Sequence, residues 1–246
     1  MLEVTGLTKQ FDGLTVFERF NLTVPHRGFT VIIGPSGCGK STLFDVLTGV
    51  VPPDDGIISW QGKPLVHLGE EAAYMQQKDL LLPWLPLMDN ALLPVKIGAT
   101  GTADGREKAA ALFSRMGLDG FESYLPGKIS GGMRQRCALV RTLMFDRELV
   151  LLDEPLSALD AITRSRLQSL LLMLQSEFRK SILMITHDIE EAILLADHLM
   201  VVSPLPMRVQ EHYEFNQPKP RQIDDPMLLR IKTHVLSRLK ENVAHE

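Results

Sequence analysis

The sequence has little of what would mark a disulfide-stapled, zinc-built or nucleic-acid-binding protein. Its 246 residues include two cysteines, Cys38 and Cys137, and neither has a metal-ligand spacing around it. A disulfide framework and a zinc module are therefore excluded, and we expect reduced, unpaired thiols. Acidic side chains outnumber basic ones by 30 to 26, which gives a formal net charge of −4. The basic surface that a nucleic-acid partner requires is absent, so no nucleic acid is expected.

Long apolar runs are also missing. No window reaches the roughly 18 uninterrupted apolar residues of a membrane span, and the run LLLPWLPLM is broken by Pro83 and Pro86. The opening residues, MLEVTGLTKQFDG, carry Glu3 and have no apolar run behind a basic stretch. We therefore expect neither a signal peptide nor a membrane-spanning helix, and a compact protein of one large or two small domains.

Three short apolar runs that end in polar residues are present instead. They are TVIIG at 30–34, ELVLLDE at 148–154 and SILMITHD at 181–188. Runs without alternation are typical of strands that are buried on both faces of a parallel sheet. A helical pattern at 161–178 lies between the last two, so this part of the chain predicts an α/β fold.

The remaining segments show other patterns. LEVTGLTKQF and LTVFERFNLTV alternate and are separated by Asp-Gly, which predicts an antiparallel hairpin. The segment 89–145 has little strand signal, and within it a helix is expected to begin near Asp104 and to end at Gly117. The segment 204–220 is punctuated by prolines, and a further helix is expected in PMLLRIKTHVLSRLKE.

A glycine-rich loop follows the first apolar run. GPSGCGKST fits G-x-x-x-x-G-K-[ST] and lies between a predicted strand and a predicted helix. Its glycines let backbone N–H groups turn toward phosphate oxygens, and the helix N-terminus adds positive potential. Lys40 can reach the β- and γ-phosphates, and the Ser41 hydroxyl is a hard ligand for Mg²⁺. Against the alternative of an ordinary loop, we expect nucleotide binding by Gly34, Pro35, Ser36, Gly37, Cys38, Gly39, Lys40, Ser41 and Thr42.

Polar residues end the other two runs. Asp153 follows a buried strand, where ligands of open α/β sheets gather, and can hold the same Mg²⁺ as Ser41. Glu154 can accept a proton from an attacking water, or orient it. The N–H of His187 could contact a γ-phosphate. The alternative is that Asp-Glu-Pro only ends a strand and that His187 is structural. A phosphate loop on the same sheet favours catalytic roles for Glu154 and His187.

A second glycine turn, ISGGM at 129–133, precedes another predicted helix and needs a separate explanation. Taken in order, GPSGCGKST, ISGGMRQR, LVLLDEP, SALD and ITHD resemble the nucleotide-binding subunit of ATP-binding-cassette (ABC) transporters over almost the whole chain. The resemblance implies an α/β fold: a P-loop NTPase core of mainly parallel sheet, an N-terminal antiparallel β subdomain and a helical insertion subdomain.

The same resemblance divides the chain, 1–246, as one ABC ATPase domain. The nucleotide-binding core takes about 1–88 and 146–203, the helical signature subdomain about 89–145, and a C-terminal tail and helix about 204–246.

In this family two subunits face each other head to tail, and each signature turn covers the ATP of its partner. The resemblance implies that Ser130, Gly131 and Gly132 act on the partner subunit in this way, aided by the dipole of the following helix. Asp160, in Ser157-Ala158-Leu159-Asp160, would belong to the D-loop that crosses the same interface.

Further roles follow from the family pattern. Phe11 stands where an aromatic ring stacks on adenine, with Val16 nearby. Gln77 corresponds to the glutamine that senses Mg²⁺ and the attacking water, with Gln76 as the alternative register. The LLPW run resembles the ATPases of nitrate, sulfonate, taurine and pyrimidine-type importers. Trp84, between two prolines, is expected to be a docking surface for a membrane partner.

The resulting hypothesis is the Mg²⁺-ATPase subunit of an ABC importer, at the cytoplasmic face of the membrane. It would use ATP and Mg²⁺ and work as a homodimer on transmembrane permease subunits, with a periplasmic or extracellular solute-binding protein as an indirect partner. Two rivals are a soluble ABC ATPase of DNA repair or translation, and a module that binds ATP without hydrolysing it. The absence of a coiled-coil insertion and of zinc cysteines argues against the first, and Glu154 and His187 argue against the second.

Overall fold

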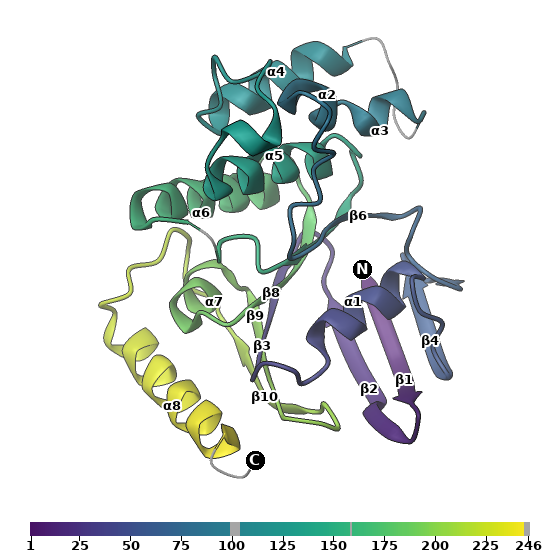
Figure 1. The fold of residues 1–246 in the computed structure, drawn as a ribbon. Helices are drawn as coiled ribbons and strands as arrows, with labels where there is room; N and C mark the ends of the chain where they lie inside the picture. Colours follow the sequence, from purple (N-terminus) through teal and green to yellow (C-terminus); the bar gives the residue numbers. More distant parts are fainter. Residues whose placement is uncertain (99–103, 158, 244–246) are drawn as a thin grey trace.

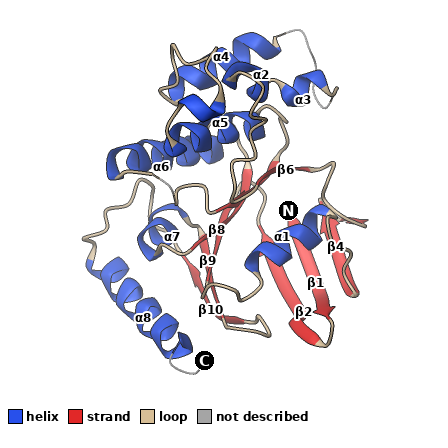
Figure 2. Ribbon diagram, viewed as in Figure 1, coloured by secondary structure: helices blue, strands red, loops and turns tan. Residues whose placement is uncertain are grey.

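The computed structural model describes residues 1–98, 104–157 and 159–243, and the side chains of this range up to residue 241. Ala158 of the predicted D-loop and the last residues of the predicted tail, 244–246, lie outside the described residues. Within the described part, helices cover one side of a central sheet, and a second sheet stands on its other side (Figures 1 and 2).

The larger sheet runs in the order β10-β9-β3-β8-β7-β6 across the described residues. Its strands are parallel except β10, which pairs antiparallel with β9. The strands are β3 (Phe29–Ile33), β6 (Ala72–Met75), β7 (Leu149–Asp153), β8 (Ser181–Thr186), β9 (His198–Val202) and β10 (Val209–Glu214). Every residue of β3, β7 and β8 is buried, which confirms the three strands predicted from uninterrupted apolar runs.

The smaller sheet is antiparallel and has the order β2-β1-β4-β5. Its strands are β1 (Leu2–Phe11), β2 (Leu14–Val24), β4 (Asp55–Trp60) and β5 (Lys63–Leu65). Strands β1 and β2 form the predicted hairpin, and the residues between them, Asp12 and Gly13, both have positive φ, as the turn requires.

The helices lie mostly on the far side of the larger sheet from this hairpin (Figure 1). Helix α1 (Lys40–Thr48) follows β3 and packs between the two sheets. The others are α2 (Leu87–Ala91), α3 (Leu93–Lys96), α4 (Gly105–Arg115), the 3-10 turn η1 (Pro126–Lys128), α5 (Gly131–Leu143), α6 (Ala161–Ser176), α7 (Ile189–Leu195) and α8 (Pro226–Val243). No described helix is both long and apolar enough to span a bilayer.

Two hydrophobic cores fill the space on the two faces of the larger sheet. One joins β3, β7 and β8 to the helices α2 and α4 to α8. The other joins the opposite faces of the same strands to α1 and the antiparallel sheet. Alternate residues of a strand point to opposite faces, so Val31 belongs to the first core and Ile32 to the second. The carboxyl ends of the buried strands are thereby fixed from both sides.

Two details differ from the expectations. The proline-punctuated segment 204–220 contains strand β10, which extends the larger sheet. Its residues are mostly exposed and it pairs with β9 alone, so no apolar run marks it. Asp104 is the N-cap residue of α4 as expected, but its side chain makes no capping hydrogen bond. The predicted subdomain boundaries remain a prediction.

Candidate nucleotide-binding site

The phosphate loop leads from β3 into α1, and its geometry requires glycine. Gly39 has a φ of 101°, and a Cβ atom there would lie 2.4 Å from Cγ1 of Val16. Only glycine combines this left-handed backbone with this close approach. Gly39 is also the N-cap of α1, and no described side chain caps the first turn of the helix. The N–H groups of that turn are therefore available to an anion.

Lys40 is folded against the loop that precedes it. Its Nζ donates to the carbonyl oxygens of Gly34, at 2.8 Å, and Pro35, at 2.6 Å, and lies 3.6 Å from Sγ of Cys38. The Cys38 side chain faces the hydrophobic core, where burial raises the pKa of its thiol, while Lys40 acts in the opposite direction. The Cys38 thiol is therefore not placed to contact a phosphate.

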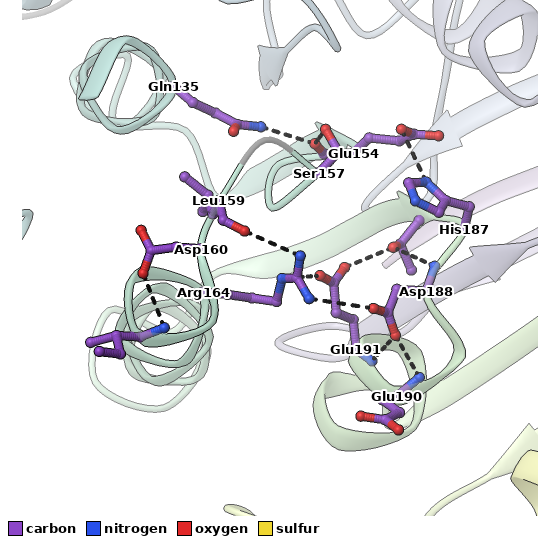
Figure 3. A network of polar contacts seen from close by, with 12 residues as sticks. Gln135, Glu154, Ser157, Leu159, Asp160, Arg164, His187, Asp188, Glu190 and Glu191 are labelled. Atoms are coloured by element: carbon purple, nitrogen blue, oxygen red, sulfur yellow. Dashed lines mark hydrogen bonds and ion pairs between the residues drawn. The ribbon is translucent and has the colours of Figure 1, made fainter. Parts of the chain in front are cut away.

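The carboxyl ends of β6, β7 and β8 bring three polar side chains together. Nδ1 of His187 lies 3.2 Å from Oε2 of Glu154 (Figure 3). Nε2 of Gln77 lies 3.2 Å from the same oxygen. Glu154 has a φ of 48°, which turns it out of line with β7, and its N–H donates to the carbonyl of Ile185 on β8. The left-handed backbone and the hydrogen bond hold the Glu154 carboxylate at the carboxyl ends of the parallel strands.

Asp153, the residue before Glu154, is buried and 3% exposed. Burial raises the pKa of its carboxyl group, and the nearby Glu154 adds to the effect. A hydrogen bond from the Ser41 side chain and the charge of Lys40 act in the opposite direction on this pKa. The Asp153 carboxylate and the Ser41 hydroxyl are two hard oxygen donors of the kind that Mg²⁺ prefers. The ammonium group of Lys40, which can bind phosphate, lies near them.

A cavity of about 500 Å³ lies between the phosphate loop and Glu154. The predicted residues Gly34, Pro35, Cys38, Asp153 and His187 are not among those that line it. The predicted residues that line it are Phe11, Val16, Ser36, Gly37, Gly39, Lys40, Ser41, Thr42, Gln77 and Glu154. Gln77 lines the cavity, whereas the alternative, Gln76, is not among the residues that line it. Phe11 is 42% exposed at the rim, with Nζ of Lys9 5.0 Å from its ring centroid. An aromatic surface at one end and phosphate-binding groups at the other match the shape of a nucleotide.

Comparison with known proteins decides the family. The description "ABC transporter" belongs to the family whose profile matches residues 17–157, more than half of the chain. The taurine import ATP-binding protein of Escherichia coli O157:H7 is 38% identical over 249 residues, which covers 98% of each chain. This chain belongs to the ABC transporter family.

A second relative agrees with this assignment, and solved structures share the fold. The taurine import ATP-binding protein of Rhizobium johnstonii is 38% identical over 206 residues, covering 83% of this chain and 79% of that protein. Among solved structures, a dimeric ATP-binding cassette bound to ADP and Pi in a post-hydrolysis state has a TM-score of 0.79 at 25% identity. It covers 89% of this chain and 100% of that one. A Clostridium perfringens subunit of an ABC transporter complex has a TM-score of 0.76 at 24% identity, and covers 97% and 96% of the two chains.

The signature turn of this ABC protein lies apart from the cavity. Ser130 is the N-cap of α5, and its Oγ accepts from the N–H of Met133 at 3.2 Å. Asp160 is the N-cap of α6 in the same way, because its carboxylate accepts from the N–H groups of Ile162 and Thr163. None of Ser130, Gly131, Gly132 and Asp160 is among the residues that line the cavity. The structure therefore does not bring the signature turn to the phosphate loop of its own chain.

A network links the D-loop to the residues after His187 (Figure 3). Arg164, on α6, donates to the carbonyl of Leu159 at 3.2 Å and lies 3.5 Å from Oε1 of Glu191 and 3.8 Å from Oδ2 of Asp188. Glu191 also accepts from the Thr186 hydroxyl at 2.7 Å. Burial raises the pKa of Glu191, and the charge of Arg164 acts in the opposite direction.

The signature helix also touches the catalytic end directly. Nε2 of Gln135, on α5, donates to the backbone carbonyl of Glu154 at 3.1 Å, and the Ser157 hydroxyl donates to the same oxygen at 3.1 Å (Figure 3). The sequence analysis named neither Gln135 nor Arg164. Gln135 could have been found, because it is a polar residue on the apolar face of a predicted helix. The partners of Arg164 are Leu159 before α6 and Asp188 and Glu191 at the start of α7, and this arrangement leaves no local signal.

The loop that carries Trp84 is exposed but firmly held. Trp84 itself is 69% exposed, whereas Leu81 is buried in the core. Asn90, on α2, is fully buried, and its amide accepts from the N–H of Leu82 and donates to the carbonyls of Leu82 and Leu85. One side chain thus fixes the backbone on both sides of the tryptophan.

Arginines of the signature helix hold the segment just before this loop. Nε of Arg134 lies 3.0 Å from Oδ2 of Asp79, and Arg141 donates to the backbone carbonyls of Asp79 and Leu80. Asp79 follows Gln77 by two residues. The segment between the cavity and Trp84 is therefore attached to α5 at Asp79 and Leu80.

Proposed function

We propose that this protein is the ATP-hydrolysing subunit of an ABC importer. The observation that carries the enzymatic part is the position of Glu154. Its carboxylate stands at the wall of the cavity, opposite the phosphate loop, with Gln77 and His187 on the same oxygen. A carboxylate held in this way can orient an attacking water and accept its proton. His187 is suited to hold the γ-phosphate, and Lys40 and the N–H groups of α1 to hold the phosphate chain.

The residues at the cavity fit Mg²⁺. The Ser41 hydroxyl, the Asp153 carboxylate and the Gln77 side-chain oxygen are hard oxygen donors, and Asp153 is a buried acid next to Ser41. When bound, Mg²⁺ would neutralise charge on the phosphates. Phe11 supplies a ring on which adenine can stack, with Val16 packed behind it.

The proposal includes a homodimer in which each signature turn completes the partner's site. Ser130, Gly131 and Gly132 stand outside the cavity of their own chain, which supports a role on another chain. The Ser130 hydroxyl accepts from Met133 and keeps its own hydrogen for a phosphate oxygen. A similar solved cassette is a dimer bound to ADP and Pi, which supports the same arrangement here.

The importer part of the proposal depends on the relatives and on Trp84. The Escherichia coli relative imports taurine, so we infer a taurine-like solute, within the wider class of nitrate, sulfonate and pyrimidine-type importers. Trp84, exposed between two prolines, is suited to dock a transmembrane permease subunit. The subunit would then work at the cytoplasmic face of the membrane, and the solute-binding protein would act on the permease from the other side.

Hydrolysis is tested with the purified protein and a phosphate-release assay. We expect ATP hydrolysis that requires Mg²⁺ and is lost when Lys40→Ala removes the ammonium group that holds the phosphates. A protein that binds Mg-ATP but releases no phosphate, alone or with its membrane partners, would instead be the ATP-binding module without hydrolysis.

The importer role is tested by isolation from membranes. The tagged subunit should co-purify with multi-spanning membrane proteins, identified by mass spectrometry, and its ATPase activity in that complex should respond to solute and binding protein. Recovery with ribosomal or DNA-repair proteins in place of membrane proteins would favour a soluble ABC ATPase.

A further inference from the structure

A cluster of two histidines and a glutamate lies on the edge of the larger sheet, at β9 and β10. His198 is the first residue of β9 and stands directly opposite Glu214 in the antiparallel pairing. His212 precedes Glu214 by two residues on β10, so its side chain points to the same face of the sheet. The three side chains therefore gather on one face although they come from two strands.

Two of the three donor atoms of this cluster are spaced as metal ligands are, and the third lies near them. Nδ1 of His198 lies 3.3 Å from Nε2 of His212 and 3.8 Å from Oε1 of Glu214, and the three donor atoms all lie within 4.8 Å of one another. Zinc bonds of about 2.0–2.1 Å at a tetrahedral angle place neighbouring donors about 3.3–3.4 Å apart. The two histidine nitrogens already have this separation. Glu214 must come closer, and its side chain, 62% exposed, has room to do so.

The chemistry of the three donors selects one class of ion. Two imidazoles and one carboxylate are the ligands of open zinc sites, which keep a fourth position for water. Imidazole nitrogen suits Zn²⁺, Ni²⁺, Co²⁺ and Cu²⁺, whereas Mg²⁺ and Ca²⁺ prefer oxygen alone. The Mg²⁺ that accompanies ATP would therefore not compete for this site.

The cluster is remote from the nucleotide cavity. His198 pairs with Thr30 near the start of β3, while the phosphate loop follows the other end of that strand. None of His198, His212 and Glu214 lines the nucleotide cavity. The cluster stands instead where β10, the outermost strand, joins β9 (Figure 1). An ion held there would bind the two strands to each other.

We propose that His198, His212 and Glu214 form a binding site for a divalent transition-metal ion of the Zn²⁺ class. The ion would be coordinated by Nδ1 of His198, Nε2 of His212 and a Glu214 oxygen, with water in the fourth position. It would fasten the edge strand β10, and with it the C-terminal tail that begins at Phe215, to the sheet. The competing explanation is a simple hydrogen bond between the two imidazoles.

The test is a titration of the full-length protein with Zn²⁺ by calorimetry, without nucleotide and with excess Mg²⁺, after treatment with a chelator. Wild-type protein should bind one equivalent of Zn²⁺. The variants His198→Gln, His212→Gln and Glu214→Gln should each bind Zn²⁺ at least about tenfold more weakly, because even the loss of a residue that only supports a ligand lowers metal affinity by about tenfold. Co²⁺ bound to wild-type protein should give the intense visible absorption of a tetrahedral or five-coordinate ion, and the variants should lose it.

Matched controls make the result decisive. His67→Gln removes an exposed histidine beside Gly49 at the end of α1 and should leave Zn²⁺ affinity and the Co²⁺ spectrum unchanged. Zn²⁺ should also raise the Tm of wild-type protein more than that of the three ligand variants, whose fold is checked by circular dichroism. Equal Zn²⁺ affinity in wild-type protein and all three variants would overturn the site and leave the imidazole hydrogen bond. Loss in only one variant would overturn it as well, because three ligands of one ion must act together.

Discussion

The phosphate loop and the signature turn are built from the same parts but have different surroundings. Both are glycine turns that lead into a helix, α1 after Gly39 and α5 after Ser130. The first is enclosed by Val16, Glu154 and other residues from both sheets. At the second, a Cβ added to Gly131 would meet only a terminal nitrogen of Arg134, at 3.5 Å, among the described atoms. The first turn has a complement within its own chain, and we propose that the partner subunit supplies the complement of the second.

The largest expected effect comes from placing one lesion in each turn of a mixed dimer. One subunit carries Lys40→Ala and the other carries Ser130→Arg. If each signature turn serves the partner's ATP, both lesions fall in one site and the other site is intact. The mixed dimer should then trap one ATP, while neither homodimer traps any. The measurement is nucleotide occlusion in the assembled transporter, since steady turnover can require two working sites.

The opposite arrangement gives the opposite result. If the signature turn served its own chain, each site of the mixed dimer would contain one lesion. An assembled mixed dimer that occludes no nucleotide would therefore refute the shared site. Ser130→Ala in place of Ser130→Arg is the control for bulk, because it removes the hydroxyl without filling the interface.

The next effect concerns hydrolysis at the enclosed turn. Glu154→Gln keeps the shape of the side chain but accepts a proton poorly. We expect turnover to fall by at least about 10²-fold, as is typical for loss of a general base, with ATP affinity nearly intact. The ATP-bound dimer should accumulate, as size-exclusion chromatography can show. Near-normal turnover in the purified variant would remove Glu154 from this role.

A smaller effect is expected where the protein meets its permease. Trp84→Ala should weaken assembly by about 2 kcal/mol, or roughly thirtyfold in Kd, as for an interface anchor. ATP binding by the isolated subunit should not change, because Trp84 is 69% exposed and its truncation should leave the fold intact. Val66→Ala, at a residue 82% exposed elsewhere, is the matched control and should assemble normally. Unfolding of the Trp84 variant would place this side chain in the core and contradict the docking role.

The smallest effect concerns the link between the D-loop and His187. Arg164→Gln removes the positive charge beside buried Glu191, so we expect a loss of about 1 kcal/mol in unfolding free energy at pH 7. Burial raises the pKa of Glu191 in the folded state above its ordinary value, and the loss of Arg164 raises it further. The folded state then binds the proton more tightly than the unfolded state does. The loss should therefore shrink as the pH falls through the folded-state pKa and Glu191 becomes neutral.

Urea unfolding at several pH values measures this effect. Arg166→Gln, on the exposed face of the same helix, is the control and should show neither the loss nor its pH dependence. A destabilisation by Arg164→Gln that does not change with pH would mean that Glu191 is not the partner that matters.

The fold could be predicted where burial leaves a pattern in the sequence. The strands β3, β7 and β8 were predictable because they are buried on both faces and carry unbroken apolar runs. The hairpin of β1 and β2 was predictable from its alternation and its Asp-Gly turn. Strand β10 was not, because its residues alternate between partly and fully exposed positions and its only described strand partner is β9.

In the candidate site, residues that are contiguous in sequence could be predicted, whereas contacts between distant segments could not. The phosphate loop is contiguous in sequence, so its residues could be named together. Gln77 and His187 both contact one carboxylate oxygen of Glu154, and the three residues follow three strands of a parallel sheet. The sequence could predict that these residues lie near one another, but not which atoms are in contact. The contacts of Arg164 with Asp188 and Glu191 join segments that are far apart in the sequence. Those of Asn90 with Leu82 and Leu85 depend on a loop conformation that no sequence pattern indicates.

The buried amide of Asn90 has a mechanical consequence. It ties the backbone around Trp84 to α2, which packs on α5, and α5 in turn holds Asp79 and Leu80 through its arginines. We therefore expect the Trp84 loop to move together with α2 and α5. A displacement of Trp84 by a permease subunit would then reach the helix whose first residues form the signature turn, and a movement of that turn would in the same way displace Trp84.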